Sequence, residues 1–158
     1  MVKRSAGILL YRRGADGVEV LLVHPGGPFW QRKDAGAWSI PKGEVGDGED
    51  ELERALREFE EETGTALAPS ELLELGAIRQ RGGKTVTAWA AAGDLDPAHV
   101  RSNTFELEWP PRSGTLRTFP EVDRAEWFSP AQARDKILPA QAELIDRLVS
   151  LLAERAAD

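Results

Sequence analysis

The segment from Gly43 to Thr65, GEVGDGEDELERALREFEEETGT, constrains this chain more than any other part of it. Ten of the residues from 44 to 62 are acidic and only two are basic. Apolar residues recur in the same segment at the spacing of one helical face, namely Leu52, Ala55, Leu56 and Phe59. The pattern predicts a helix over about 50–63 that buries one stripe and exposes a dense set of carboxylates.

The ends of this helix are also marked in the sequence. Asp50 is followed three residues later by Glu53, a spacing related to the capping box. Gly64 fits the residue that follows the last helical position.

Three of the carboxylates share a face beside the apolar stripe. Glu58, Glu61 and Glu62 are three or four residues apart, which places them within an arc of about 100° on a helix. At an effective dielectric near 20, two unit charges about 4 Å apart repel by roughly 4 kcal/mol. A divalent cation reverses the sign of this energy, and hard oxygen ligands select Mg²⁺ or Mn²⁺, which share their shell with substrate phosphates. The residues therefore predict a metal site for a phosphorylated ligand.

The same residues resemble a known family pattern. The Nudix box reads G-x5-E-x7-R-E-U-x-E-E-x-G-U, in which U is a bulky apolar residue. The chain matches its fixed positions with Gly43, Glu49, Arg57, Glu58, Glu61, Glu62 and Gly64. Phe59 serves as the first apolar residue, whereas Thr65 stands where Ile, Leu or Val is usual, so we expect packing to differ there. The resemblance implies an α/β/α sandwich around a mixed β-sheet, in a single domain over residues 1–158.

The resemblance also implies roles for the box residues. The three clustered glutamates are expected to bind Mg²⁺, with Mn²⁺ as a substitute, and to carry catalysis. Gly43 is assigned to the same metal site and to the turn from strand into loop. Glu49 and Arg57 are expected to hold the loop to the helix by an ion pair, and Gly64 to complete the structural part of the box. The other interpretation of the glutamates is a solvated acidic helix face.

A fourth carboxylate is expected outside the box. Glu121 lies in the loop Phe119–Asp123, just before the predicted strand that contains Trp127. Nudix members often place a metal ligand or a general base in this loop, and Glu121 is the candidate here. The alternative is an ordinary loop acid. Glu106 and Glu108 are weaker rivals, because they alternate with apolar residues on a predicted half-exposed strand.

Several cations are candidates for binding phosphates. Lys42 directly precedes the box and could donate to a phosphate oxygen. Arg79, Arg81 and Lys84 cluster around a predicted hairpin and could reach the distal phosphates of a long polyphosphate. For each of these residues a solvated surface position is the alternative.

Aromatic residues next to loops could stack on a nucleobase. Phe29, Trp30 and Trp109 are in such positions, although core packing is the alternative for each. His24 and His99 are isolated in the sequence and are assigned to no site.

The rest of the chain alternates predicted strands and helices, which indicates a mixed α/β domain. A hairpin of strands 4–11 and 18–24 surrounds a turn with an Asp-Gly signal. Further strands are predicted at 37–40, 71–80, 84–92, 104–109 and 125–128. Helices are predicted after Ser129, which is followed by Pro130, and over about 140–155.

Composition limits the classes of partner. The chain has 158 residues, 41% of them apolar, which suits one compact domain. Its net charge is −7 and the acidic surplus falls within residues 44–62, so we expect no basic footprint for a large nucleic acid. There is no cysteine, which excludes disulfides and thiolate metal sites. No apolar run is long enough to span a membrane. The apolar run Ser5–Tyr11 is followed by Arg12-Arg13, so we interpret it as a strand and expect a cytoplasmic protein.

The resemblance implies hydrolysis of a pyrophosphate bond in a nucleoside diphosphate linked to another moiety. The segment 38–43, Lys84 before a strand, and Glu121 before Trp127 are similar to diadenosine tetraphosphate hydrolases. A nucleoside triphosphate or dinucleoside polyphosphate is therefore the favoured substrate. The alternatives are an inositol pyrophosphate substrate, a non-catalytic nucleotide sensor and a protein-interaction scaffold. The oligomeric state stays open, with a homodimer among the options.

Overall fold

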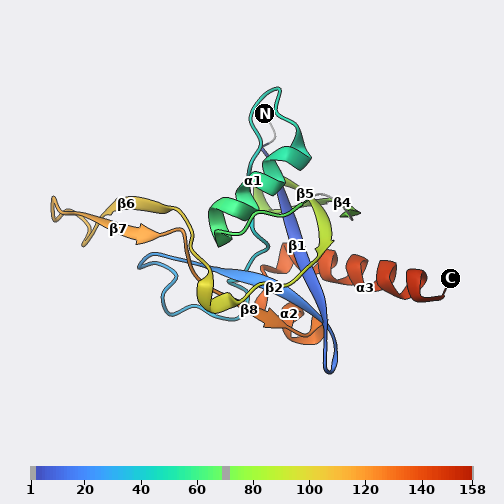
Figure 1. Ribbon diagram of the computed structural model, residues 1–158. Coiled ribbons are helices and arrows are strands. Elements are labelled where there is room, and N and C mark those ends of the chain that lie inside the picture. Colours follow the sequence, from blue (N-terminus) through green and yellow to red (C-terminus); the bar gives the residue numbers. More distant parts are fainter. Residues whose placement is uncertain (1–2, 69–71, 158) are drawn as a thin grey trace.

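A mixed six-stranded sheet forms the middle of the molecule in this computed structural model, which describes residues 3–68 and 72–157 (Figure 1). Its strands follow the order β4-β5-β1-β2-β8, with β3 paired to β1. They are β1 (Arg4–Gly14), β2 (Gly17–Pro25), β3 (Lys42–Glu44), β4 (Leu72–Arg79), β5 (Thr85–Ala92) and β8 (Val122–Phe128). The pair β1 and β5 is parallel, and the other pairs are antiparallel.

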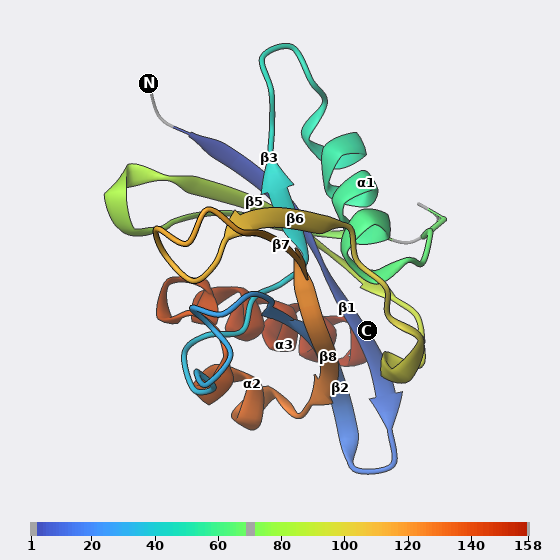
Figure 2. The ribbon, with the colours of Figure 1, turned by 90° about the vertical axis from the view of Figure 1, so that its left-hand side faces the viewer.

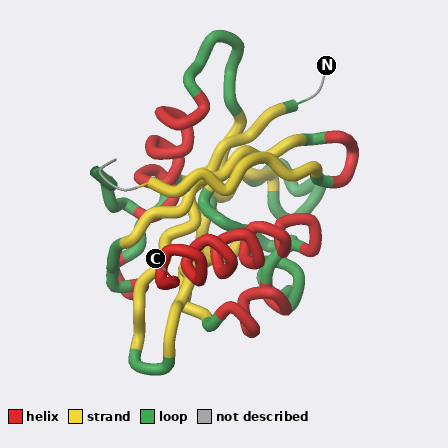
Figure 3. The backbone as a smooth tube through the Cα atoms, turned by 90° about the vertical axis from the view of Figure 1, so that its right-hand side faces the viewer, coloured by secondary structure: helices red, strands yellow, loops and turns green. Residues whose placement is uncertain are grey.

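Helices cover both faces of this sheet, so the predicted sandwich is confirmed. Helix α1 (Glu51–Thr63) lies on one face, and α2 (Pro130–Lys136) and α3 (Ala142–Ala157) lie on the other (Figures 1 and 3). Short 3-10 turns occur at Arg81–Gly83, Pro97–His99 and Pro139–Gln141. No helix in the described ranges combines the length and apolar character needed to cross a bilayer.

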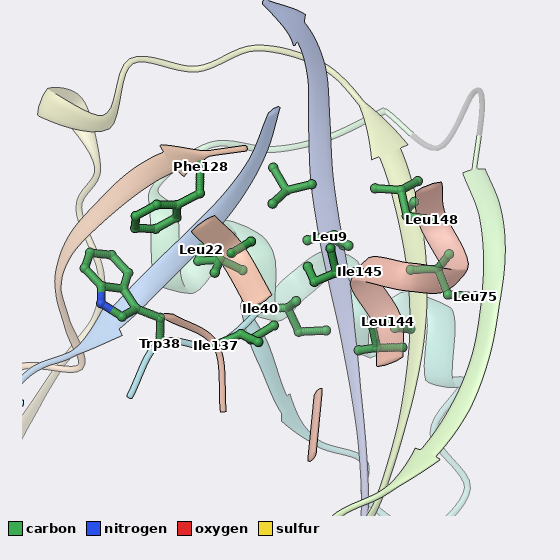
Figure 4. Close-up of a cluster of buried hydrophobic side chains, with 14 of the residues drawn as sticks. Leu9, Leu22, Trp38, Ile40, Leu75, Phe128, Ile137, Leu144, Ile145 and Leu148 are labelled. Atoms are coloured by element: carbon green, nitrogen blue, oxygen red, sulfur yellow. The ribbon is translucent and has the colours of Figure 1, made fainter. Parts of the chain in front are cut away.

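The core is divided into two clusters by the alternation of side chains along the central strands. The cluster under α3 takes alternate residues of β1 and β2 and packs them against Trp38 and the inner face of the helix (Figure 4). Its members from these elements include Leu9, Val20, Leu22, Leu144, Ile145 and Leu148. The intervening strand residues Ile8, Leu10, Leu21 and Val23 pack with Ala55 and Phe59 of α1. Both faces of the sheet are therefore apolar, which explains the unbroken apolar runs of the first hairpin.

A second, two-stranded sheet projects from the body. It consists of β6 (Thr104–Glu108) and β7 (Leu116–Pro120), paired antiparallel. The hairpin lies on the same side of the molecule as the loop 26–36 (Figure 2). The sequence predicted the first of these strands but not the second, because β7 is almost entirely exposed and has no apolar alternation.

The predicted strand at 37–40 is wrong. Residues Trp38 and Ser39 form only isolated bridges, and the strand β3 begins after Pro41. Proline has no N–H for a ladder, but its carbonyl accepts the Ile8 N–H at 3.1 Å, so pairing with β1 resumes beyond it. The other predicted strands agree with the structure within a few residues, although residue 71 lies outside the described part of the chain.

The segment 38–44, which we call the wedge segment, lies between β1 and β2. Ser39 exchanges two backbone hydrogen bonds with Val23 of β2, at 2.9 and 3.0 Å. A few residues later, Lys42–Glu44 pairs with Ser5–Gly7 of β1. The two strands separate to admit this segment, and Lys42 stands where it crosses from one strand to the other.

Gln141 fixes the start of this crossing from the α3 side. Its side chain is fully buried, and its Oε1 accepts the Ile40 N–H at 3.1 Å. Its Nε2 donates to the Ser39 hydroxyl at 3.0 Å and to Gln80 Oε1 at 3.1 Å. A buried amide that satisfies a buried N–H is expensive to remove, so Gln141 is a structural residue for the segment that leads into Lys42.

Replacing Gln141 with leucine should therefore destabilise the fold. The Gln141→Leu variant leaves the buried Ile40 N–H without its acceptor, which costs about 1–3 kcal/mol. Urea unfolding followed by circular dichroism measures this loss. Gln31→Leu, at an exposed loop position, is the matched control and should change little. Equal stability of the two variants would show that the Gln141 contacts do not hold this segment.

Candidate functional site

The helix that carries the clustered glutamates is capped at both ends. The Asp50 side chain accepts the Glu53 N–H at 3.0 Å, and this is the N-cap contact that the sequence predicted. At the other end Gly64 is left-handed, with φ of 80°, and its N–H donates to the Glu60 carbonyl at 2.7 Å. Only a residue without a Cβ adopts this conformation at little cost. The helix therefore begins and ends where predicted.

Glu62 is the most buried of the clustered acids. Its Oε2 accepts the backbone N–H of Lys42 at 2.9 Å, which joins the helix to the wedge segment. Burial raises the pKa of Glu62 to about 8, and the neighbouring carboxylates of Glu58 and Glu121 act in the same direction. Burial also lowers the pKa of the Lys42 ammonium, while Glu62 opposes that effect. The structure thus brings Lys42 and Glu62 into one electrostatic environment.

Glu58 lies directly against Gly43. A Cβ at Gly43 would stand 2.0 Å from Glu58 Cδ, so only glycine leaves room for this carboxylate. Arg54 Nη1 donates to Glu58 Oε1 at 3.0 Å. Burial raises the pKa of Glu58, and the charges of Glu61 and Glu121 raise it further. The glycine is therefore required by close approach to the Glu58 carboxylate. It does not serve the expected turn from strand into loop, because it lies within β3 and has no positive φ.

The ion pair at the start of the helix differs from the expected one. Glu49 Oε2 accepts from Arg54 Nη2 at 2.6 Å and from Arg54 Nε at 3.1 Å, in place of the expected Arg57. Arg57 is exposed. Because adjacent helical residues are rotated by about 100°, Arg57 points away from the side that Glu58 occupies, whereas Arg54 is one turn before Glu58 and shares its face. Arg54 therefore links the loop and the carboxylate cluster at once.

Glu121 is held next to this helix by its backbone. Its N–H donates to the Asn103 carbonyl at 2.9 Å, and its carbonyl accepts the Gly26 N–H at 2.9 Å. Asn103 in turn donates its N–H to the Glu61 carbonyl at 2.9 Å, near the end of α1. A chain of main-chain hydrogen bonds therefore runs from the helix to Glu121. Sequence reasoning missed Asn103, because nothing near it marks this link.

A cavity of 210 Å³ opens at this place. Lys42, Glu62 and Glu121 contribute to its lining, together with Trp30 from the loop 26–36. Four of the residues that the sequence proposed separately therefore meet at one cavity. Its remaining walls are apolar for the most part, which is typical of small-molecule sites.

The other proposed cations and acids lie outside this cavity. The ammonium of Lys84 is close enough to add to the lowering of the Lys42 pKa, whose main cause is burial. Arg81 lines a second cavity, of 440 Å³, which shares Leu138 with the first. Arg79 is exposed at the end of β4. Glu106 and Glu108 are exposed on β6, and Glu108 accepts the N–H of Arg112 at 2.8 Å.

The donor set fits a divalent cation by its chemistry. Among the described residues, no three His, Asp or Glu side chains are already gathered as an ion site. Two box carboxylates, Glu58 and Glu62, are nevertheless partly buried, and burial raises the pKa of each. The charge of Glu121 raises both pKa values further, Glu61 adds to the rise at Glu58, and Glu58 adds to the rise at Glu62. Hard carboxylate oxygens are the ligands that Mg²⁺ prefers, and its charge would relieve this repulsion.

Two aromatic side chains of the loop 26–36 are exposed, and one of them, Trp30, lines the cavity. Trp30 is 36% exposed, and the Lys33 ammonium lies 5.0 Å from its ring centre. Phe29 is 61% exposed and packs edge-on against Trp109 at 5.4 Å between centroids. These rings are not core residues, which removes the alternative interpretation for Phe29 and Trp30.

His24 is a residue that sequence reasoning left out. It is fully buried, with Nδ1 2.8 Å from Asp123 Oδ1 and Nε2 2.6 Å from the Lys33 carbonyl oxygen. The paired residues His24 and Asp123 are 99 positions apart, so no local pattern could reveal them.

The chain is similar in sequence to a family of known proteins. The NUDIX domain family model matches residues 1–148. The asymmetrical bis(5'-nucleosyl)-tetraphosphatase of Rattus norvegicus is 32% identical over 102 residues, which cover 58% of this chain and 65% of that protein. The enzyme of the same name from Caenorhabditis elegans is 40% identical over 62 residues, covering 39% of this chain and 41% of that protein. The chain thus spans less than two thirds of the length of these relatives.

The fold is shared with a solved structure. The crystal structure of a C. elegans Ap4A hydrolase binary complex superimposes with a TM-score of 0.66 at 24% identity. The match covers 97% of this chain and 99% of that chain.

The contact between Gly43 and Glu58 predicts an effect of Gly43→Ala on ion binding. Gly43 does not have a positive φ, so alanine is compatible with its backbone, and the flexible Glu58 side chain can move aside. We expect little change in thermal stability but a Mg²⁺ affinity reduced about 10-fold or more, as in Glu58→Ala. Isothermal titration calorimetry and thermal melts measure the two quantities. Affinity at the wild-type value would contradict the displacement of Glu58.

The raised pKa of Glu62 predicts a pH-dependent stability in EDTA. The folded chain holds this proton up to about pH 8, whereas the ordinary value is 4.5. Between these values folding takes up a proton, so wild-type stability falls as the pH rises. Glutamine at this position has no such proton, and the stability advantage of Glu62→Gln should grow from about pH 5 to about pH 8 and then level.

Thermal melts across this pH range provide the measurement. Glu60→Gln, an exposed neighbour on the same helix, is the control and should differ from wild type by the same small amount at every pH. A pH-independent difference for Glu62→Gln as well would show that Glu62 ionises normally in the folded chain.

Proposed function

This chain belongs to the NUDIX domain family, and from that premise we propose that it is a cytoplasmic, Mg²⁺-dependent pyrophosphohydrolase of nucleotides. The proposed reaction is attack of water on phosphorus in a nucleoside diphosphate linked to another moiety. The water oxygen forms a bond to phosphorus, the bridging P–O bond breaks, and the leaving phosphate keeps the electron pair. The observation that carries the proposal is the meeting of Lys42, Glu62 and Glu121 at one cavity beside Glu58.

The family uses divalent metal ions, and we assign the ion of this chain to the box carboxylates. Glu58, Glu61 and Glu62 would hold Mg²⁺, with Mn²⁺ as a substitute, next to Gly43. When bound, the ion neutralises phosphate charge and lowers the pKa of a coordinated water. The hydrogen bond from the Lys42 N–H to Glu62 keeps one of these carboxylates oriented.

Glu121 and Lys42 are proposed to act on the substrate side of the cavity. Glu121 would either take the proton of the attacking water or add a further ligand to the ion. Its backbone is fixed at both the N–H and the carbonyl, so its carboxylate starts from a defined position. The Lys42 ammonium would donate to a phosphate oxygen, since charge-assisted bonds to phosphate are strong.

We favour a nucleoside triphosphate or a dinucleoside polyphosphate as substrate. Two relatives carry the name of tetraphosphatases that act on bis-nucleosyl substrates. In this chain, Lys84 near Lys42 and Arg81 in the adjoining cavity would bind further phosphates of such a chain. Trp30 and Phe29 would provide faces for a nucleobase, because bases stack on aromatic rings.

The proposal predicts a defined pattern of activity. Phosphate release should depend on Mg²⁺ and be fastest with nucleoside triphosphates or dinucleoside polyphosphates in a panel that also holds nucleotide sugars, inositol pyrophosphates and capped RNA. Glu61→Gln should lower turnover roughly 100-fold or more with the fold intact. Glu121→Gln should lower it by about 10²–10⁴-fold if this carboxylate is the base.

Glu60→Gln is the matched control on the same helix, because Glu60 is exposed and faces away from the cluster. It should keep wild-type rates. Wild-type rates in Glu61→Gln would refute the ligand assignment, and tight nucleotide binding without turnover on any substrate would favour a sensor.

A further inference from the structure

We propose that His24 is a positioning residue that fixes Glu121 and the Trp30 loop relative to each other. The assignment rests on the function proposed above, because it gives Glu121 and Trp30 their roles. His24 itself touches neither the cavity nor the box carboxylates. It acts through two hydrogen bonds, one to each of the segments that form the substrate side of the site.

The ring of His24 uses both of its nitrogens. Nε2 lies 2.6 Å from the Lys33 carbonyl oxygen, which can only accept, so Nε2 carries a proton and donates it. Nδ1 lies 2.8 Å from Asp123 Oδ1, so these two side chains are joined by a second hydrogen bond. The ring is fully buried and packs edge-on against Trp38 at 5.1 Å. Burial of an imidazole is costly unless both nitrogens are bonded, and here both are.

The bond to Asp123 acts on Glu121 through a β-bulge. In the pairing of β2 with β8, His24 is opposite Arg124 and the following Pro25 is opposite Val122. Asp123 is thus the extra residue of β8, and its side chain bonds to His24. Bulges re-aim the side chains beside them, and Glu121 is two residues before Asp123.

The backbone beside the bulge is closely packed. Gly26, two residues after His24, donates its N–H to the Glu121 carbonyl at 2.9 Å. A Cβ on Gly26 would stand 2.0 Å from the Pro120 carbonyl oxygen, so the backbone after β2 lies directly against the backbone before β8. A shift of Asp123 away from His24 would therefore move Glu121.

The bond to Lys33 acts on the loop that carries Trp30. Within this loop the turn is closed locally, by Lys33 N–H donating to the Trp30 carbonyl at 3.0 Å. The His24 Nε2 bond ties that turn to β2, and the next anchor along the chain is Asp34, which accepts the Trp38 indole N–H at 2.8 Å. Trp30 lines the cavity with Glu62 and Glu121. His24 therefore sets how far this aromatic ring stands from the carboxylates.

Two substitutions separate the two bonds. In His24→Gln the terminal amide occupies the place of Nε2 and keeps the bond to Lys33, while the bond to Asp123 is lost. In His24→Asn the amide occupies the place of Nδ1 and keeps the bond to Asp123, while the bond to Lys33 is lost. The chain has only one other histidine, and His99 is exposed, so the same changes at His99 are matched controls.

We expect the two His24 variants to change different kinetic constants, measured with a substrate that the activity panel above has identified. His24→Gln should lower kcat about 10-fold with little change of KM, because Glu121 is displaced. His24→Asn should raise KM about 10-fold with little change of kcat, because the Trp30 loop is released. Asp123→Asn leaves the ring in place and should behave like His24→Gln, which keeps the test open if a His24 variant does not fold. The proposal would be overturned if all three variants lowered kcat and raised KM by equal factors.

A second readout does not depend on activity. In ¹H–¹⁵N spectra of the metal-free protein, the His24 Nε2–H should be visible and protected from exchange with water, unlike the ring protons of His99. The indole N–H signal of Trp30 should shift in His24→Asn and stay in place in His24→Gln. An unprotonated Nε2, or an unmoved Trp30 signal in His24→Asn, would refute the positioning role. Absence of turnover in the wild type with these spectral results present would instead refute the proposed function alone.

Discussion

Packing several carboxylates into a partly buried space between α1 and β3 is the constraint on which the rest of this structure depends. Ionised acids repel one another and lose hydration when buried, and both effects raise the pKa of Glu58 and Glu62. The fold tolerates them through a few specific contacts. Arg54 pairs with Glu58, the Lys42 N–H bonds to Glu62, and Gly43 leaves space that any side chain would fill. Each contact keeps an acid in place where a cation would be attracted.

The surroundings hold this arrangement mainly by backbone. Ser39 pairs with Val23 on the approach to Lys42, and the N–H and carbonyl of Asn103 connect the end of α1 to Glu121. Main-chain hydrogen bonds depend little on side-chain identity, so they position the acids without adding charge to the site. Few side chains then remain as candidates for binding or catalysis, and they come from segments far apart in the sequence.

Local signals in the sequence predicted the helix, its caps and most strands, because alternation, periodicity and capping residues all lie within short windows. The family pattern marked the box acids, and the loop before β8 marked Glu121. What escaped prediction required contacts between distant segments. Strand β3 exists because β1 and β2 separate, which no local pattern encodes. Glu49 pairs with Arg54 and not with Arg57 because of the helix face that meets the loop. The hydrogen bond of His24 to Asp123 joins residues 99 positions apart.

The hairpin of β6 and β7 depends little on these contacts between distant segments. Within the described residues neither core cluster includes a side chain from it, and its two strands pair only with each other. The hairpin nevertheless projects on the side of the molecule where the loop 26–36 lies (Figure 2). This loop carries Phe29 and Trp30. A segment that contributes little to folding but borders the candidate site is free to diverge. Exchange of hairpins between such proteins would be a route to new ligand preferences on an unchanged fold.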